Sequence, residues 1–123
     1  MSGMFANCEV LASLDFSNFN TSIVKDMSSM FSWCLSLSSI TFSYGFNTGE
    51  VSNMKNMFYN CTHLVQLDIY VFDTQKVTDM SYMFFNCRAL TSLDLHSFDT
   101  HKVTSMESMF YWCTSLTTIY ASD

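Results

Sequence analysis

The sequence predicts an α/β repeat solenoid of about five units, with short parallel strands on one face and short helices on the other. The first observation behind this prediction is a motif, Met-x-x-Met-Phe-x-x-Cys, that occurs five times and begins anew every 26 or 27 residues. A repeat of this length is typical of stacked arrays, in which each unit packs only on its neighbours. The second observation is that the apolar pattern within each unit changes from a three-residue step to a two-residue alternation, as between a helix and a strand.

The chain of 123 residues is predicted to be a single repeat domain, because the same apolar columns run along its whole length. Its core is predicted to contain ladders of identical side chains, formed by the Phe and the Cys of each motif. These residues are Phe5, Phe31, Phe58, Phe84 and Phe110, with Cys8, Cys34, Cys61, Cys87 and Cys113. The units are expected to span approximately residues 1–19, 20–46, 47–72, 73–98 and 99–123.

The first element of each unit is predicted to be a short helix over the motif. In the fourth unit, the apolar residues follow one another at steps of three, three, one and three, which places them on one stripe of a helix. They are Val77, Met80, Met83, Phe84 and Cys87. So short a helix is unstable alone, because nucleation costs more than a few hydrogen bonds return. We therefore expect neighbouring units to bury this stripe.

An Asn-Thr or Asp-Thr pair precedes the motif in four units. The side-chain oxygen of such a residue accepts a free backbone N–H at a helix start or in a turn, so we expect the pair to cap the helix and close the turn. The pairs are Asn20-Thr21, Asn47-Thr48, Asp73-Thr74 and Asp99-Thr100. In the second unit one extra residue lies between Phe42 and Phe46, where Gly45 is expected to form a bulged turn.

The second element of each unit is predicted to be a short strand. In "LTSLDL" of the fourth unit, alternation directs Leu93 and Leu95 inward and Asp94 outward. Outward side chains on a rigid sheet are suited to recognising a partner, and these columns contain Asp and aromatic residues. The alternative is a merely solvated face whose Asp residues provide solubility. The predicted binding residues are Asp15, Thr41, Asp68, Tyr70, Asp94, His96 and Tyr120.

The five cysteines are predicted to be reduced, buried thiols rather than zinc ligands or disulfides. They form no C-x-x-C pair, and no His recurs at a fixed distance from them, so the usual zinc spacings are absent. In stacked units, neighbouring Cys side chains would run parallel at about 5 Å, whereas a disulfide needs Cβ atoms about 3.8 Å apart and directed at each other. The odd number of cysteines favours the same interpretation.

Catalytic motifs are absent from the sequence, and we expect a protein that is not an enzyme and needs no metal or cofactor. There is no phosphate-binding Gly-rich loop, H-E-x-x-H or G-x-S-x-G. The stretch "DLHSFDTH" could form a metal or acid–base site from His96, His101, Asp94 and Asp99. No other unit has this pair of histidines, so surface variation is the preferred interpretation.

Composition and charge narrow the possible partners. With 49% apolar and 13% charged residues, the chain can bury a core and does not have the composition of a disordered protein. Its net charge of −6 would repel phosphate backbones, so no nucleic-acid partner is expected. No stretch approaches the length of a membrane span and no secretory signal is visible. Neither terminal unit shows a polar cap, which suggests an excerpt of a longer array or an end-to-end homodimer.

The motif resembles that of a known repeat family. "MFFNCRAL" followed by "LTSLDL" resembles the leucine-rich repeat module L-x-x-L-x-L, so the predicted solenoid is leucine-rich-repeat-like. "FDTQKVTDMSYMFFNC" is similar to the approximately 26-residue repeat of the BspA-like leucine-rich repeat proteins of bacterial surfaces. The resemblance covers the whole chain and implies adhesion or host-protein binding, at the cell surface or after secretion, without catalytic residues.

These observations together predict a non-enzymatic binding or adhesion module that recognises a protein or glycan through its strand face. A structural spacer or stalk that projects another domain is the first alternative. An intracellular scaffold or effector repeat protein is the second. The sequence does not assign a compartment, because the surface location rests on the resemblance alone.

Overall fold

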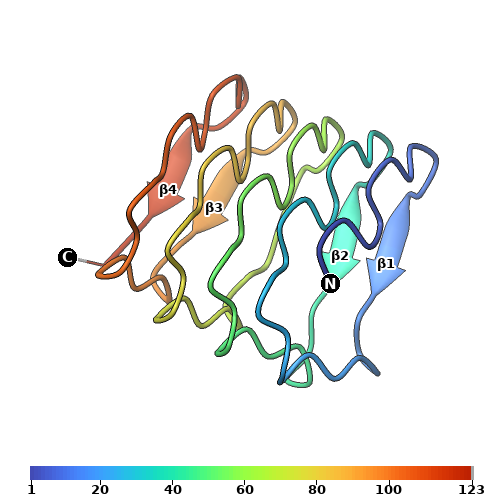
Figure 1. Cartoon of the computed structure of the whole chain (residues 1–123). Helices are drawn as coiled ribbons and strands as arrows, with labels where there is room; N and C mark the ends of the chain where they lie inside the picture. The colour runs from blue at the N-terminus through green and yellow to red at the C-terminus, as the bar shows by residue number, and fades with distance from the viewer. Residues whose placement is uncertain (123) are drawn as a thin grey trace.

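The computed structural model describes residues 1–122, which wind into a stack of coils with one coil for each copy of the motif (Figure 1). We number the coils one to five from the N-terminus. Four three-residue strands lie along one face: β1 (Ser13–Asp15), β2 (Ser39–Thr41), β3 (Ser92–Asp94) and β4 (Thr118–Tyr120). They pair in parallel, β1 with β2 and β3 with β4, as expected when each strand enters from an equivalent coil.

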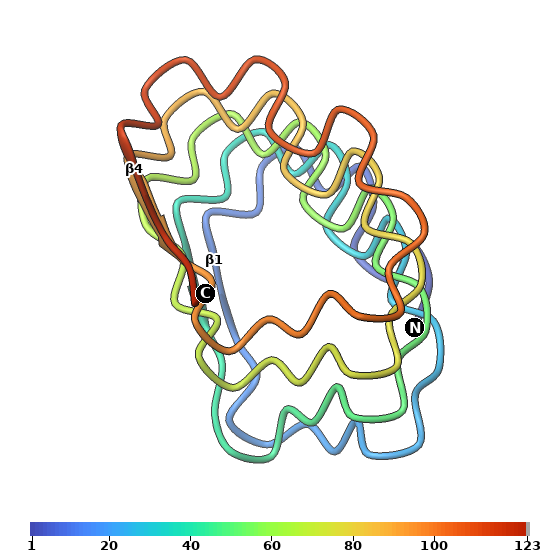
Figure 2. The same cartoon turned by 90° about the vertical axis from the view of Figure 1, so that its left-hand side faces the viewer.

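The strand row is interrupted in the middle coil, where residues 66–68 form no regular strand. A second ladder runs across the coil from the strands, on the side where the N-terminus lies (Figure 2). It consists of single parallel bridges that join coils two to five. These bridges link Asp26, Asn53, Asp79 and Ser105 in succession. The bridges thus continue through the middle coil, where the strand row is interrupted.

The predicted α/β fold class is wrong, because residues 1–122 contain no α-helix. Each copy of the motif has left-handed backbone at two positions, the residue before the second Met and the residue before the Cys. In coil four these are Tyr82, with φ 58°, and Asn86, with φ 59°. Such residues cannot belong to a right-handed helix. The segment instead forms successive tight turns, such as the one closed by the hydrogen bond from the Met83 N–H to the Met80 carbonyl at 3.2 Å.

Alternate N–H groups of the motif donate to the next coil, which is the physical reason for this difference. The Tyr82 N–H donates to the Glu107 carbonyl at 2.8 Å and the Phe84 N–H to the Met109 carbonyl at 3.0 Å. A helix would keep these donors within its own segment. Here these N–H groups find carbonyl acceptors in the next coil, so the same hydrogen bonds join the two coils. A three-residue apolar step fits this zigzag of turns as well as it fits a helix, so the periodicity alone was misleading.

The core lies inside the coils and consists of stacked columns. The rings of Phe58 and Phe84 are 5.5 Å apart and inclined by 3°, and the other neighbours in this column are 5.3 to 5.8 Å apart. In coils two to four both Met columns, the Cys column and the Leu column that follows it are fully buried. In the end coils, Phe5, Cys8, Phe110 and Cys113 are partly buried. The burial of these columns provides the main stabilisation of the stack.

The Asn-Thr and Asp-Thr pairs close turns as predicted, but they cap no helix. The Asp73 carboxylate accepts the Gln75 N–H at 3.0 Å, which closes the turn. The buried Thr has a different role, which is to join coils. The Thr74 hydroxyl donates to the Asp99 carbonyl at 2.9 Å and accepts the Asp99 N–H at 2.7 Å. Thr21 and Thr48 make the same pair of bonds with the next coil, and we call this arrangement the threonine clamp.

Gly45 serves close packing rather than a left-handed bulge, because its φ is not among the positive ones. A Cβ added there would lie 3.2 Å from the Phe19 carbonyl oxygen. That distance is shorter than ordinary van der Waals contact. The extra residue of the second coil is therefore accommodated by letting the backbone of one coil approach the next.

The threonine clamp predicts a stability difference between two chemically identical substitutions. Thr74→Val should lower the free energy of unfolding by about 2 kcal/mol, because it leaves a partly buried N–H and a partly buried carbonyl of Asp99 without their partner. Thr104→Val removes one exposed hydroxyl bond to the Thr78 carbonyl and should cost less than about 1 kcal/mol. Urea unfolding of both variants measures this. Equal losses would show that the clamp does not stabilise the stack.

Candidate functional site

The strand face presents every predicted binding residue to solvent. In β3, Leu93 is only 1% exposed while Asp94, the next residue, points outward and is exposed. This alternation follows from the pleat of the strand, which directs successive side chains to opposite sides. The exposed residues are Asp15, Thr41, Asp68, Tyr70, Asp94, His96 and Tyr120. Exposure makes them available to a partner but does not by itself make them a site.

Three of these residues lie around one shallow depression of about 270 Å³. Asp68 comes from the irregular middle coil, Asp94 from β3 and Tyr120 from β4, and Gln66, Leu67 and Ser92 complete the lining. Asp94 and Tyr120 are partners in the parallel register, which holds them side by side. The depression therefore combines two carboxylates, an aromatic ring and neighbouring polar groups, which is a suitable combination for binding a polar ligand or a protein side chain.

The carboxylates of this face also hold the turns that follow the strands. The Asp94 carboxylate accepts the His96 N–H at 2.9 Å, and the His96 ring lies 2.7 Å from the same oxygen. These hydrogen bonds, the backbone one first, lower the pKa of Asp94 below its ordinary value. The Ser17 hydroxyl and backbone N–H lower the pKa of Asp15 in the same way. Both groups consequently keep their negative charge into more acidic solution than a free aspartate would.

The remaining predicted residues do not converge on the depression. His96 lies against the ring of Tyr120, with centroids 6.4 Å apart, so it borders the depression from the side. Tyr70 instead packs edge-on against Tyr44 at 6.2 Å. Asp15 and Thr41 are register partners in the β1–β2 pair, which is separate from the β3–β4 pair. The predicted set thus divides into one compact group and several outlying residues.

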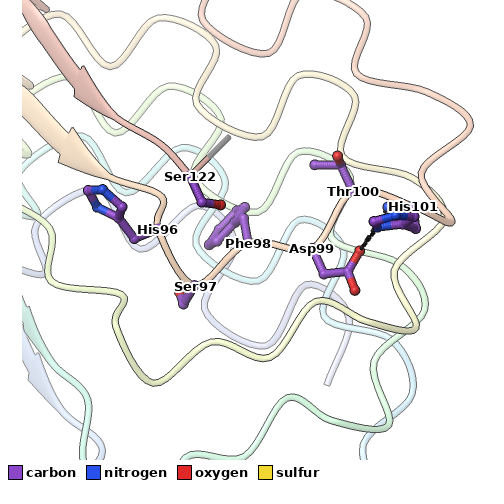
Figure 3. Close-up of a pocket in the computed structure, with 7 residues that line it drawn as sticks. All are labelled: His96, Ser97, Phe98, Asp99, Thr100, His101 and Ser122. Atoms are coloured by element: carbon purple, nitrogen blue, oxygen red, sulfur yellow. Dashed lines mark hydrogen bonds and ion pairs between the residues drawn. The ribbon is translucent and has the colours of Figure 1, made fainter.

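A second hollow, of about 420 Å³, lies beside the two histidines of "DLHSFDTH" (Figure 3). His101 pairs with Asp99 at 2.8 Å, and His96 pairs with Asp94, so each ring is bound to the carboxylate two residues before it. Within residues 1–122, no group of three or more His, Cys, Asp or Glu side chains is placed to hold a metal ion. Each histidine therefore pairs with an aspartate of its own turn, and the two histidines do not form a shared ligand site.

The cysteines are free thiols whose environment is unsuited to nucleophilic chemistry. Each thiol from coil two onward donates to the carbonyl of the motif Phe in the preceding coil, as Cys87 does to Phe58 at 3.2 Å. Burial raises the pKa of Cys34 to about 11, and it also raises the pKa values of Cys61 and Cys87 well above the ordinary value of a thiol. The reactive thiolate is therefore disfavoured at neutral pH.

A row of half-buried and exposed aromatic rings along the motif segments was missed by the sequence reasoning. The rings contact one another across coils, for example Tyr59 and Phe85 with centroids 4.7 Å apart and planes inclined by 7°. Except for Tyr82, which lies between the two Met residues, their signal was present in the two variable positions between the motif Phe and Cys, which read SW, YN, FN and YW in coils two to five. We call this row the aromatic ridge; it consists of Trp33, Tyr59, Tyr82, Phe85, Tyr111 and Trp112.

Short parallel strands in register on one face of a coil stack, with Leu and Phe columns inside, are typical of leucine-rich repeat folds. The crystal structure of a T. pallidum leucine-rich repeat protein is similar to this chain, with a TM-score of 0.57 at 17% sequence identity. The match covers 97% of this chain and 60% of that one, so the chain spans about three fifths of the length of the structure it matches. At this identity the similarity concerns the fold alone.

The sequence also matches the profile of a named family over two consecutive segments, residues 1–45 and 44–122. The chain belongs to this family, DUF285, which is described as a Mycoplasma protein of unknown function. No curated protein matches the chain. In residues 1–122 no helix has the length and apolar character needed to cross a membrane.

The burial of the thiols predicts that cysteine alkylation differs sharply between the native and the unfolded protein. In the native protein at pH 8, Cys34, Cys61 and Cys87 should resist iodoacetamide, because they are buried and their raised pKa values keep them protonated. In denaturant all five cysteines should react. Mass spectrometry of the labelled peptides provides the measurement. Rapid native labelling of Cys61, or fewer than five labels after unfolding, would contradict the predicted column of free thiols.

Proposed function

We propose that this chain is a non-enzymatic binding module that recognises a protein or a glycan through its strand face, in the manner expected of BspA-like surface proteins. The observation that carries the proposal is the group formed by Asp68, Asp94 and Tyr120 around one depression. The fold and the family support a repeat protein, and the shape and charge of this face support a binding role.

The physical argument rests on pre-organisation. β3 is held by its register with β4 and by the buried Leu93 beneath it, so the outward Asp94 loses little freedom when a partner binds. Asp94 is oriented further by its own turn, and the Tyr120 ring is flanked by His96. An oriented carboxylate next to a half-exposed aromatic ring suits partners that combine hydrogen-bond donors with an apolar surface.

The test uses a substitution that removes charge and keeps the turn. Asn accepts a backbone N–H as Asp does, so Asp68→Asn combined with Asp94→Asn should fold normally while losing both charges of the depression. Binding is measured by surface plasmon resonance against purified host extracellular proteins and by a glycan array. We expect the double variant to bind any ligand so identified at least about tenfold more weakly, which corresponds to about 1.4 kcal/mol.

The matched control is Asp73→Asn, which removes a charge from a turn that does not line the depression. Asn20 and Asn47 occupy the same column in other coils, so this change is compatible with the fold. Unchanged binding by the control together with weakened binding by the double variant supports the strand face. If the double variant binds every identified ligand as tightly as the original chain, the proposal is wrong.

A further inference from the structure

The turns that follow the strand positions form one edge of the stack, and Tyr44 is the most exposed aromatic side chain in residues 1–122. Its ring is 90% exposed, and its one aromatic neighbour among these residues is Tyr70, edge-on with centroids 6.2 Å apart. Phe42 and Phe46, which precede and follow it in the chain, are buried and fill the core of the coil. The core therefore does not account for this tyrosine, which offers a partner an apolar ring face and a polar hydroxyl.

Tyr44 stands between two hollows of this edge. One, of about 480 Å³, lies between the turns of coils one and two, and the other, of about 310 Å³, lies between the turns of coils two and three. Both are lined by Tyr44 and Asn47, and both volumes are within the roughly 300–1,000 Å³ typical of small-molecule sites. The hollow beside His96 and His101 is the equivalent place between coils four and five (Figure 3). The repeat thus produces the hollows, and the lining of each one decides what it can bind.

The lining of the first hollow is polar and uncharged around the rings of Tyr44 and Phe19. It provides amide and hydroxyl groups from Ser17, Asn18, Asn20, Ser22 and Asn47. The Asn20 Oδ1 accepts the Ser22 N–H at 3.0 Å, and the Asn47 Oδ1 accepts the Gly49 N–H at 2.8 Å. These turns fix the orientation of both amides, and no acceptor within residues 1–122 takes up their Nδ2 donors. Oriented hydrogen-bond donors beside Tyr44 therefore remain available to a ligand.

This lining favours one class of ligand over the others. Phosphate, sulfate or carboxylate groups would find no cation, since no Lys or Arg lines either hollow and Asp73 lines the second. A protein hot spot needs a fully desolvated pocket, whereas these hollows are shallow and rimmed by amides and hydroxyls. A sugar ring combines hydroxyl oxygens, which accept from amide donors, with an apolar C–H face, which packs on the negative face of an aromatic ring. An uncharged carbohydrate therefore fits both features of the edge.

We propose that the edge around Tyr44 binds an uncharged carbohydrate chain, with one sugar ring packed on Tyr44 and neighbouring rings in the two hollows. The hollows lie one coil apart, and the Phe rings of successive coils are 5.3 to 5.8 Å apart, which is close to the advance of one pyranose unit in an extended chain. The site shares no residue with the depression formed by Asp68, Asp94 and Tyr120, so it does not rest on the proposed function.

The first test is a glycan array that contains neutral, sialylated and sulfated glycans, followed by calorimetric titration with linear oligomers of glucose, galactose and N-acetylglucosamine. We expect binding of a neutral series and weaker binding of its sialylated or sulfated members. The affinity should rise from one to three sugar units, because successive units reach the second hollow. It should change little between low and high salt, since no charge pair is formed. If no neutral oligomer binds at millimolar concentration, or if binding requires acidic groups, the proposal is wrong.

Two matched tyrosine variants locate the site. Tyr44→Ser should weaken binding of the neutral oligomer at least about tenfold, because the ring platform is lost. Tyr111→Ser is the control, since it also removes an exposed tyrosine and lies in the aromatic ridge away from both hollows. Ser17 and Ser32 stand at the corresponding positions of other coils, so both changes are compatible with the fold. Equal binding by the two variants would overturn the proposal.

A second substitution tests the amide donors without disturbing the turns. Asn20→Asp combined with Asn47→Asp keeps the acceptors of both turns, as Asp73 and Asp99 do in later coils, and removes the two Nδ2 donors. This variant should unfold at the same urea concentration as the original chain and bind the neutral oligomer at least about tenfold more weakly. Unchanged binding would contradict the site. Loss of oligomer binding in Asp68→Asn with Asp94→Asn, but not in Tyr44→Ser, would assign the sugar to the strand face instead.

Discussion

The structure depends on how the backbone of the Met-Phe-Cys motif distributes its hydrogen bonds. Alternate N–H groups close local turns, and those between them donate to the next coil, as Phe84 does to Met109. This second set requires each coil to return to the same height and register as its neighbour. The side-chain columns follow from this requirement, because identical residues then lie directly above one another. The flat Phe stack and the threonine clamp are consequences of the same register.

The features that recur in every unit were predictable from the sequence, and those that depend on left-handed backbone were not. The Phe and Cys columns, and the inward Leu93 beside the outward Asp94, follow from spacing alone. The helix prediction failed because nothing in a hydrophobic pattern signals that Tyr82 or Trp33 has a positive φ. The exposure of the predicted site residues could be read from alternation, but the grouping of Asp68 with Asp94 and Tyr120 depends on how the middle coil packs beside β3 and β4. The interruption at residues 66–68 has no signal in the sequence.

The two surfaces of the stack differ because different constraints act on them. On the strand face, Asp serves its own turn as well as solvent, so its presence in three coils has a local explanation alongside any binding role. On the opposite side, the variable positions of the motif are free of core packing and yet contain large aromatic residues. Two of them, Trp33 and Trp112, also have a positive φ, which bulky side chains rarely adopt.

The hydrogen bonds between coils run along the stack, and this direction has a mechanical consequence. A tension applied between the two termini loads those bonds at an end coil before it reaches the middle. The end coil then peels away while the others keep their contacts, so extension proceeds in steps. Each step releases about 26 residues, or roughly 90 Å of extended chain, and shortens the folded stack by one coil. A stack of this design would behave as a stepwise extensible tether.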